Sequence, residues 1–153
     1  MSIDARLNEL GIVLPEAAAP VASYVPVVVH GGLAFVSGQV SFVEGTLLKG
    51  RLGEDVSLED GMRAARGCGL MILAQLKAAL GSLDRVERVV KLGGFVNSTP
   101  DFTDQPRVVN GASDLMLEVF GEAGKHARAA VGVPSLPLGV AVEVDAIVAV
   151  SDG

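Results

Sequence analysis

The chain has 153 residues, half of them hydrophobic and only 20% charged, which is enough for one folded domain and excludes a disordered, solvating role. Eighteen acidic residues outnumber 12 lysines and arginines, the net charge is -6, and tryptophan is absent. Binding to nucleic acid phosphates requires a basic surface, so this composition argues against a nucleic-acid partner. The high apolar fraction also predicts that some apolar surface is buried between subunits.

The sequence gives no sign of membrane insertion or export. The longest uncharged stretches, 17–29 and 129–142, are too short to span a bilayer as a helix and contain proline. The N-terminus carries charges where a signal peptide has an apolar core. Because the single cysteine, Cys68, cannot form an internal disulfide, we expect a cytoplasmic protein with no membrane partner.

The N-terminal residues predict a short helix followed by a linker. Ser2 is suited to cap the helix, apolar residues repeat at helical spacing after it, and Gly11 ends it. An Ala/Pro-rich stretch then runs to Pro20. We therefore expect a helical arm and linker over residues 1–20 of a single domain that covers 1–153.

The next segment predicts a β-hairpin. Two short β-branched runs, 25–29 and 33–37, are joined by His30-Gly31-Gly32, where glycine permits the positive φ angles of a tight turn. Residues 46–51 are candidates for a third strand that extends this hairpin.

The remaining elements alternate between helices and strands. The pattern predicts a helix from Ser57 to Gly81, a strand over 86–96, a helix from Pro106 or Val108 to Phe120, and strands over 128–133 and 140–150. Glycines inside the first helix lower its intrinsic stability and predict close packing on a sheet. The order indicates an α+β domain with two main helices on one face of a mixed β-sheet.

Common catalytic and metal-binding motifs are absent from the sequence. It has no phosphate-binding loop, dinucleotide fingerprint, HExxH or CxxC motif. His30 and His126 fall in predicted turns without nearby ligand spacing, which favours surface residues over metal ligands. Cys68 lies among apolar helix residues, which favours an inert core thiol over a nucleophile. Nucleotide hydrolysis, Rossmann dehydrogenase chemistry and common zinc chemistry therefore lack their usual signatures.

Three charged residues in the last two predicted strands are the candidates for chemistry. If those strands form an antiparallel hairpin with Val133 opposite Val140, Arg128 lies opposite Asp145, and Glu143 shares their face. One interpretation is a cross-strand ion pair. The other is a site in which the guanidinium binds a carboxylate while a nearby acid orients a water molecule.

Two blocks of sequence that contain these residues resemble a known family. The first is Tyr24 with Leu33-Ala34-Phe35-Val36-Ser37-Gly38-Gln39, and the second runs from Ala127-Arg128-Ala129-Ala130 through Leu136-Pro137 to Val142-Glu143-Val144-Asp145. They resemble the RidA/YjgF/YER057c/UK114 family of reactive-intermediate deaminases, formerly called endoribonuclease L-PSP. The resemblance implies a chorismate-mutase-like homotrimer with small pockets between subunits, which hydrolyses enamines and imines such as 2-aminoacrylate to a 2-keto acid and ammonia without a cofactor.

The resemblance also implies roles for individual residues. Arg128 matches the arginine that binds the substrate carboxylate, and Glu143 matches the glutamate associated with the attacking water. The matching substrate-binding positions are Tyr24, Ser37, Gly38, Asn110 and Ala130. His126 stands where the family commonly has proline, and segments 2–10 and 98–107 exceed the compact pattern, which indicates a longer, divergent subgroup.

Other functions remain open from the sequence alone. A non-catalytic trimer could use the same pocket to bind or sense a 2-keto acid. A ribonuclease is disfavoured by the acidic net charge and by the absence of a suitable histidine pair. A structural trimer with a vestigial pocket is the remaining alternative.

Overall fold

The computed structural model describes residues 1–19 and 23–152, so Pro20, the end of the predicted linker, lies outside the described residues. The helices and strands in chain order are α1 (Ile3–Glu9), β1 (Val27–His30), β2 (Leu33–Val40), β3 (Phe42–Val43), β4 (Thr46–Leu47), α2 (Leu58–Leu80), η1 (Leu83–Arg85), β5 (Val86–Asn97), α3 (Gln105–Phe120), η2 (Gly121–Gly124), β6 (Ala127–Val133), η3 (Pro137–Gly139) and β7 (Val142–Val150). None of the helices in this described part is long and apolar enough to cross a membrane.

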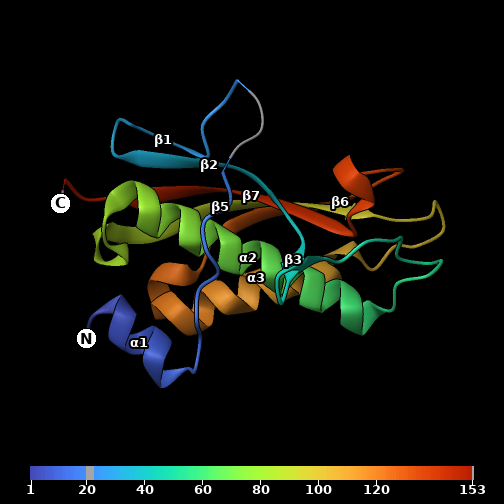
Figure 1. Cartoon of the computed structure of the whole chain (residues 1–153), viewed down its shortest axis with the longest axis horizontal. Coiled ribbons are helices and arrows are strands. Elements are labelled where there is room, and N and C mark those ends of the chain that lie inside the picture. The colour runs from blue at the N-terminus through green and yellow to red at the C-terminus, as the bar shows by residue number, and fades with distance from the viewer. Residues whose placement is uncertain (20–22, 153) are drawn as a thin grey trace.

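A five-stranded mixed sheet forms the centre of the fold. Its strand order is β1-β2-β7-β5-β6, and only the pair β5–β6 is parallel. Figure 1 shows α2 and α3 side by side on one side of this sheet, while neither of them covers the opposite face. The predicted α+β architecture, with two main helices on one face of a mixed sheet, is confirmed.

The hydrophobic core lies between the sheet and the two long helices. In β7 every second residue from Val142 to Val150 is buried, because successive side chains of a strand point to opposite faces. The alternate residues of β7, which include Glu143 and Asp145, are half-buried and lie on the open face. The sheet therefore has one face in the core and one without a helical cover.

Local sequence signals explain where the long helices begin, end and approach each other. The Ser57 hydroxyl accepts a hydrogen bond of 3.1 Å from the backbone N–H of Asp60, and Gly81 ends α2 with a φ of 84°. Gly111 of α3 lies against the backbone of α2, where an added Cβ would come within 2.0 Å of the Met62 carbonyl oxygen. The predicted bounds of both helices are confirmed to within a few residues.

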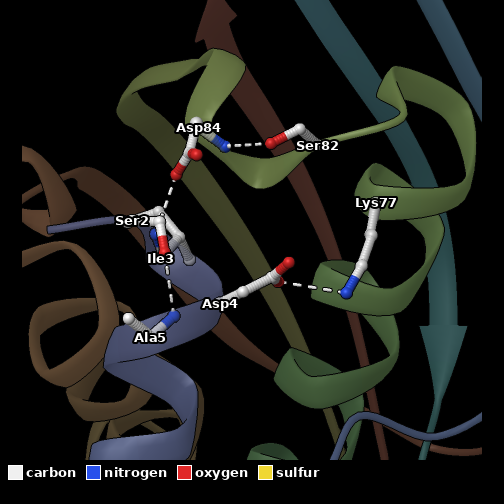
Figure 2. Close-up of polar contacts among 7 residues, drawn as sticks. All are labelled: Ser2, Ile3, Asp4, Ala5, Lys77, Ser82 and Asp84. Carbon is white, nitrogen blue, oxygen red and sulfur yellow. Dashed lines mark hydrogen bonds and ion pairs between the residues drawn. The ribbon is translucent and has the colours of Figure 1, made fainter.

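The N-terminal helix is attached to the body of the domain. The Ser2 hydroxyl accepts a hydrogen bond from the N–H of Ala5, and Asp84 accepts one of 2.7 Å from the N–H of Ile3, as Figure 2 shows. Asp4 pairs with Lys77 of α2 at 3.0 Å. The predicted helix is confirmed, and these contacts hold it against η1 and α2.

The predicted pairing of the last two strands is wrong. β6 does not pair with β7 but runs parallel to β5, which lies between them. The reason is the strand–helix–strand order β5-α3-β6, because a helical crossover returns the chain in the same direction. Residues 46–51 also do not extend the first hairpin, since Thr46–Leu47 pairs with Phe42–Val43 in a separate two-stranded sheet.

Candidate functional site

Arg128 and the two acids of β7 do not share a face, so the predicted arrangement of these three residues is wrong. Arg128 pairs with Leu92 of β5, whose side chain is fully buried on the helix side of the sheet. Glu143 pairs with Phe95, on the opposite face. Because β6 and β7 are also two strand spacings apart, about 10 Å, the Arg128 and Glu143 side chains belong to separate parts of the subunit surface.

Arg128 is held by uncharged oxygen atoms of α3. Its guanidinium donates to the Asn110 Oδ1 at 2.8 Å, to the Ser113 Oγ at 3.1 Å and to the Pro106 carbonyl at 3.3 Å. Neither Asp145 nor any other carboxylate of the described residues lies within 4 Å of its nitrogen atoms. The predicted ion pair is therefore absent from this part of the chain, and the side chain is restrained with its charge unpaired.

Through Ser113, Arg128 is connected to His126, which the sequence had predicted to lie in a surface turn. His126 is half-buried, its Nε2 lies 2.9 Å from the Ser113 Oγ, and its Nδ1 lies 2.6 Å from the Gly124 carbonyl oxygen. Ser113 was missed as well. Its spacing of three residues from Asn110 on a helix is the signal that could have placed both on one face.

Four of the other predicted site residues gather around β2 and the adjoining part of β7, on the other side of β5 from Arg128. The β2–β7 register shifts between Val36 and Gln39, and this irregularity contains Ser37 and Gly38. The Ser37 hydroxyl donates to the Val25 carbonyl at 2.8 Å, which places Ser37 beside the segment that carries the half-exposed Tyr24. The Glu143 carboxylate covers Gly38, where an added Cβ would lie 2.8 Å from Oε2.

The predicted residues therefore form two groups in the subunit. We call Asn110, Arg128 and Ala130 the arginine group; Ala130 lies two residues after Arg128 on the same face of β6. We call Tyr24, Ser37, Gly38 and Glu143 the glutamate group. Within one subunit the structure brings together the members of each group but does not join the two groups.

Both acids on the open face of β7 are less acidic than usual. Burial raises the pKa of the Glu143 carboxyl above its ordinary value, and the charge of Asp145 raises it further. Burial also raises the pKa of Asp145, although the Gly93 backbone and Lys91 oppose this effect. A carboxyl with a raised pKa is better suited to exchange protons near neutral pH.

Cys68 has no part in either group. It is fully buried, its thiol donates to the Val142 carbonyl at 3.4 Å, and burial raises the pKa of the thiol far above its ordinary value. A thiol that stays protonated is a poor nucleophile. The prediction of an inert core thiol is confirmed.

Several cavities in the described part of the chain lie outside the two groups. One of about 620 Å³ lies between residues 13–18, the β3–β4 turn and α2, and contains none of the predicted site residues. Another, of about 340 Å³, is a hollow on the open sheet face that is lined in part by Phe35, Lys91 and Asp145. The second hollow shows that the open face carries both apolar and charged side chains.

A comparison to protein families identifies the family to which this fold belongs. The family model described as "YjgF/chorismate mutase-like, putative endoribonuclease" matches residues 4–148. The chain belongs to this family, and the resemblance recognised from its two sequence blocks is confirmed.

The chain is also similar to individual proteins. The chain is 55% identical over 148 residues to Protein TCP17 of Trypanosoma cruzi, covering 95% of this chain and 92% of that protein. It is 50% identical to the protein Atu1372 of unknown function from Agrobacterium tumefaciens, with a TM-score of 0.90 and coverage of 97% and 92%. It is also 25% identical to E. coli TdcF, whose structure contains bound serine, with a TM-score of 0.64 and coverage of 91% and 98%.

Proposed function

We propose that this protein is an enamine and imine deaminase that converts small amino-acid derivatives such as 2-aminoacrylate to a 2-keto acid and ammonia. In this proposal Arg128 binds the substrate carboxylate and Glu143 positions the attacking water. Family membership and the serine bound in TdcF, itself a small amino-acid carboxylate, both support a substrate of this class.

The observation that carries the proposal is the state of Arg128. Its guanidinium is fixed by three uncharged oxygens and has no carboxylate partner within the described residues. A planar guanidinium that is held in place but not neutralised is suited to bind a carboxylate through two parallel hydrogen bonds. A cross-strand ion pair would have neutralised the guanidinium and occupied the N–H donors that a substrate carboxylate needs.

The arginine and glutamate groups can act on one substrate only if different subunits supply them. Within a subunit, Arg128 lies on the helix side of an edge strand and Glu143 on the open face two strands away. A homotrimer in which the arginine group of one chain meets the glutamate group of the next contains three equivalent sites. The open face of the sheet, where Phe35 and Val131 are exposed, is available for such an assembly.

The proposed chemistry needs only orientation and proton transfer. A water oxygen bonds to the imine carbon while the C=N π electrons move to nitrogen, which takes up a proton. Glu143 accepts this proton from the attacking water and passes it to the nitrogen, which gives a carbinolamine. It then carries the carbinolamine hydroxyl proton to the same nitrogen as the C–N bond breaks, so that the carbonyl forms and ammonia leaves. The raised pKa of Glu143 favours both transfers near neutral pH.

The test is hydrolysis of 2-aminoacrylate generated in the assay by a dehydratase. We expect Arg128→Ala to lower the rate by about 100-fold or more, because the substrate loses its fixed orientation. Glu143→Gln is also expected to lower the rate of hydrolysis. This variant still binds the substrate carboxylate, because Arg128 is unchanged. Wild-type activity in Arg128→Ala would contradict the proposed role of Arg128.

Mixing the two inactive variants tests whether the site is shared. If each site takes Arg128 from one chain and Glu143 from another, unfolding and refolding Arg128→Ala together with Glu143→Gln restores both residues in about a quarter of the sites. Each variant refolded alone is the control and stays inactive. Failure to recover activity in mixed trimers would contradict a shared site, and carboxylate binding without any turnover would favour the sensing alternative.

A further inference from the structure

Arg51 is a half-buried cation whose hydrogen-bonding capacity is largely unused. Its Nη2 donates to the Ser98 carbonyl at 3.3 Å, whereas its Nε is buried and has no acceptor among the described residues. No carboxylate of these residues lies within 4 Å of the guanidinium, and Asp55 instead accepts the backbone N–H of Arg51 at 2.7 Å. Buried donors and charges are normally paired. The guanidinium therefore keeps both its charge and N–H groups for an anion.

Ser98 and Gln105 contribute further unused donors beside Arg51. Ser98 is only 6% exposed, and its hydroxyl forms no side-chain hydrogen bond within the described chain. The Gln105 amide has two N–H groups, one of which donates to the Phe102 carbonyl at 2.8 Å. Both side chains point at Gly132, because a Cβ added there would lie 2.6 Å from the Ser98 Oγ and 2.7 Å from the Gln105 Nε2. The glycine thus leaves open the space into which the hydroxyl and the amide project.

Arg51, Ser98 and Gln105 line the same cavity, which has a volume of about 260 Å³. Among its lining residues Arg51 alone is charged, so the cavity offers a single positive charge. Much of the remaining wall is apolar and consists of Pro100, Phe102, Val133 and Pro134. Pockets for drug-sized ligands have volumes of about 300–1,000 Å³, so this cavity suits a smaller organic molecule.

The charges around the cavity favour a monoanion over a dianion such as phosphate. Asp55 is held by the backbone N–H of Arg51. Asp101 accepts from the hydroxyl of Thr99, another lining residue, at 2.7 Å. These two negative charges repel a dianion more strongly than a monoanion. A planar guanidinium also matches the two oxygens of a carboxylate.

We propose that this cavity binds a small monocarboxylate that carries an apolar group. Arg51 pairs with the carboxylate, Ser98 and Gln105 donate hydrogen bonds to it, and the apolar group packs on the prolines and the aromatic ring of the wall. This site goes beyond the proposed function, because the cavity contains none of the residues assigned to the deaminase site. Gly132 lies four residues after Arg128, about 13 Å along β6.

The experiment uses benzoate as the probe and NMR of the isotope-labelled protein as the measurement. Benzamide, which has the same size but no charge, is the matched control ligand. We expect benzoate to shift the backbone amide resonances of Ser98 and Gly132 to saturation, in the wild type and in Arg128→Ala alike. We also expect benzoate to bind about tenfold or more tightly than benzamide or inorganic phosphate. Because Arg128→Ala lacks the other carboxylate anchor, binding to this variant does not depend on the proposed function.

Variants show whether the cavity residues carry the binding. Arg51→Gln is expected to lower benzoate affinity by about tenfold or more, and Ser98→Ala by a smaller factor. Arg107→Gln is the matched control, because Arg107 is an exposed cation of α3 that does not line the cavity; we expect a change of less than about twofold. Circular dichroism confirms that each variant is folded. Should Arg51→Gln fail to fold, Gly132→Ala decides, because its methyl group occupies the space between the donors and is expected to weaken benzoate binding.

The negative outcomes are distinguishable from failure of the proposed function. Equal affinities for benzoate and benzamide, or unchanged benzoate affinity in folded Arg51→Gln, overturn this inference. Shifts confined to residues around Arg128 also overturn it and leave the proposed function standing. Tighter binding of phosphate than of benzoate contradicts the monocarboxylate class. Conversely, benzoate binding at Arg51 in a protein without deaminase activity overturns the proposed function alone.

Discussion

Arg128 illustrates how a side chain can be fixed without losing its charge. Three neutral acceptors on α3 restrict the guanidinium, whereas a carboxylate would have restrained it and cancelled its field. The remaining N–H donors stay available for an incoming anion, since guanidinium has five donors in a fixed plane. Arg128 can therefore bind an anion because the groups that hold it in place are uncharged.

Glu143 and Asp145 make stability depend on pH in a direction opposite to that of a salt-bridged acid. Their pKa values are raised in the folded state, chiefly by burial. Their neutral forms therefore favour the fold below the unfolded-state pKa values near 4, and this contribution is lost as pH rises through the raised values. We expect the double variant Glu143→Gln/Asp145→Asn to gain stability over the wild type between pH 4 and pH 7.

Urea unfolding of both proteins across this pH range measures the effect. The relevant quantity is the difference in unfolding free energy between variant and wild type. The contributions of all other acids to the pH dependence are common to both proteins and cancel in this difference. A difference that shrinks as pH rises would show that these carboxylates are stabilised in the fold as anions. Lys91→Met is a useful companion, because removing this cation should enlarge the difference by raising the pKa of Asp145 further.

At the scale of elements, α3 and β6 form the arginine group as a unit. The crossover β5-α3-β6 lays α3 across the helix side of β6, and residues 110 and 113 on one face of α3 then meet Arg128. Because α3 also packs closely on α2, its position is set by the core. The geometry of the anion-binding side chains therefore depends on how α3 packs against α2.

Gly111→Ala tests the close approach of α3 to α2. Helix propensity alone predicts that alanine stabilises the helix by about 1 kcal/mol. An added Cβ would, however, lie 2.0 Å from the Met62 carbonyl oxygen, a backbone atom, so the helices must separate. We expect a loss of about 1–3 kcal/mol in unfolding free energy, as for other overpacked core positions.

The matched control is Asp114→Ala on the same helix. Asp114 is exposed, so its replacement is expected to leave the stability unchanged or slightly higher. Urea titration at a fixed protein concentration measures both variants. The sign of the Gly111→Ala effect decides the question, and a net gain would mean that the two helices do not touch at this point.

At the scale of the whole molecule, the sheet has a covered and an open face. The helices bury one side, while Phe35, Val131 and their neighbours leave an apolar surface on the other. In a chain that is half hydrophobic, such a surface favours association between copies. The same association is what the proposed site needs to bring its two residue groups together.

Phe35→Asp tests the role of the open face in assembly. Phe35 is 41% exposed on this face, and a buried carboxylate there would oppose a subunit interface. We expect the wild type to be a trimer by light scattering and Phe35→Asp to be a folded monomer without deaminase activity. Leu117→Asp is the control, because Leu117 is similarly exposed, at 39%, but lies on α3. Its trimer is expected to persist.

The outcomes separate two parts of the proposal. A trimeric Phe35→Asp variant would show that the chains associate through another surface. A monomeric wild type would exclude any site shared between copies and leave Arg128 and Glu143 too far apart to act together.

Much of the fold follows from local sequence signals. Ser2 and Ser57 cap their helices, Gly31 and Gly32 turn the first hairpin with positive φ angles, and the alternation in the last strand identifies its core face. These features act over a few residues, so they are readable in a linear sequence. The resemblance carried by two sequence blocks was likewise enough to identify the family.

Only the tertiary structure decided which strands are neighbours. The sequence placed Arg128 and Asp145 in adjacent strands along the chain, but β5 lies between those strands because a helical crossover favours the parallel pair. The hydrogen-bond partners of Arg128 consequently come from α3. One of them, the Ser113 hydroxyl, also lies within hydrogen-bonding distance of His126. Periodicity determines which face of a strand a residue occupies, whereas its partners across the sheet depend on long-range pairing that no local pattern encodes.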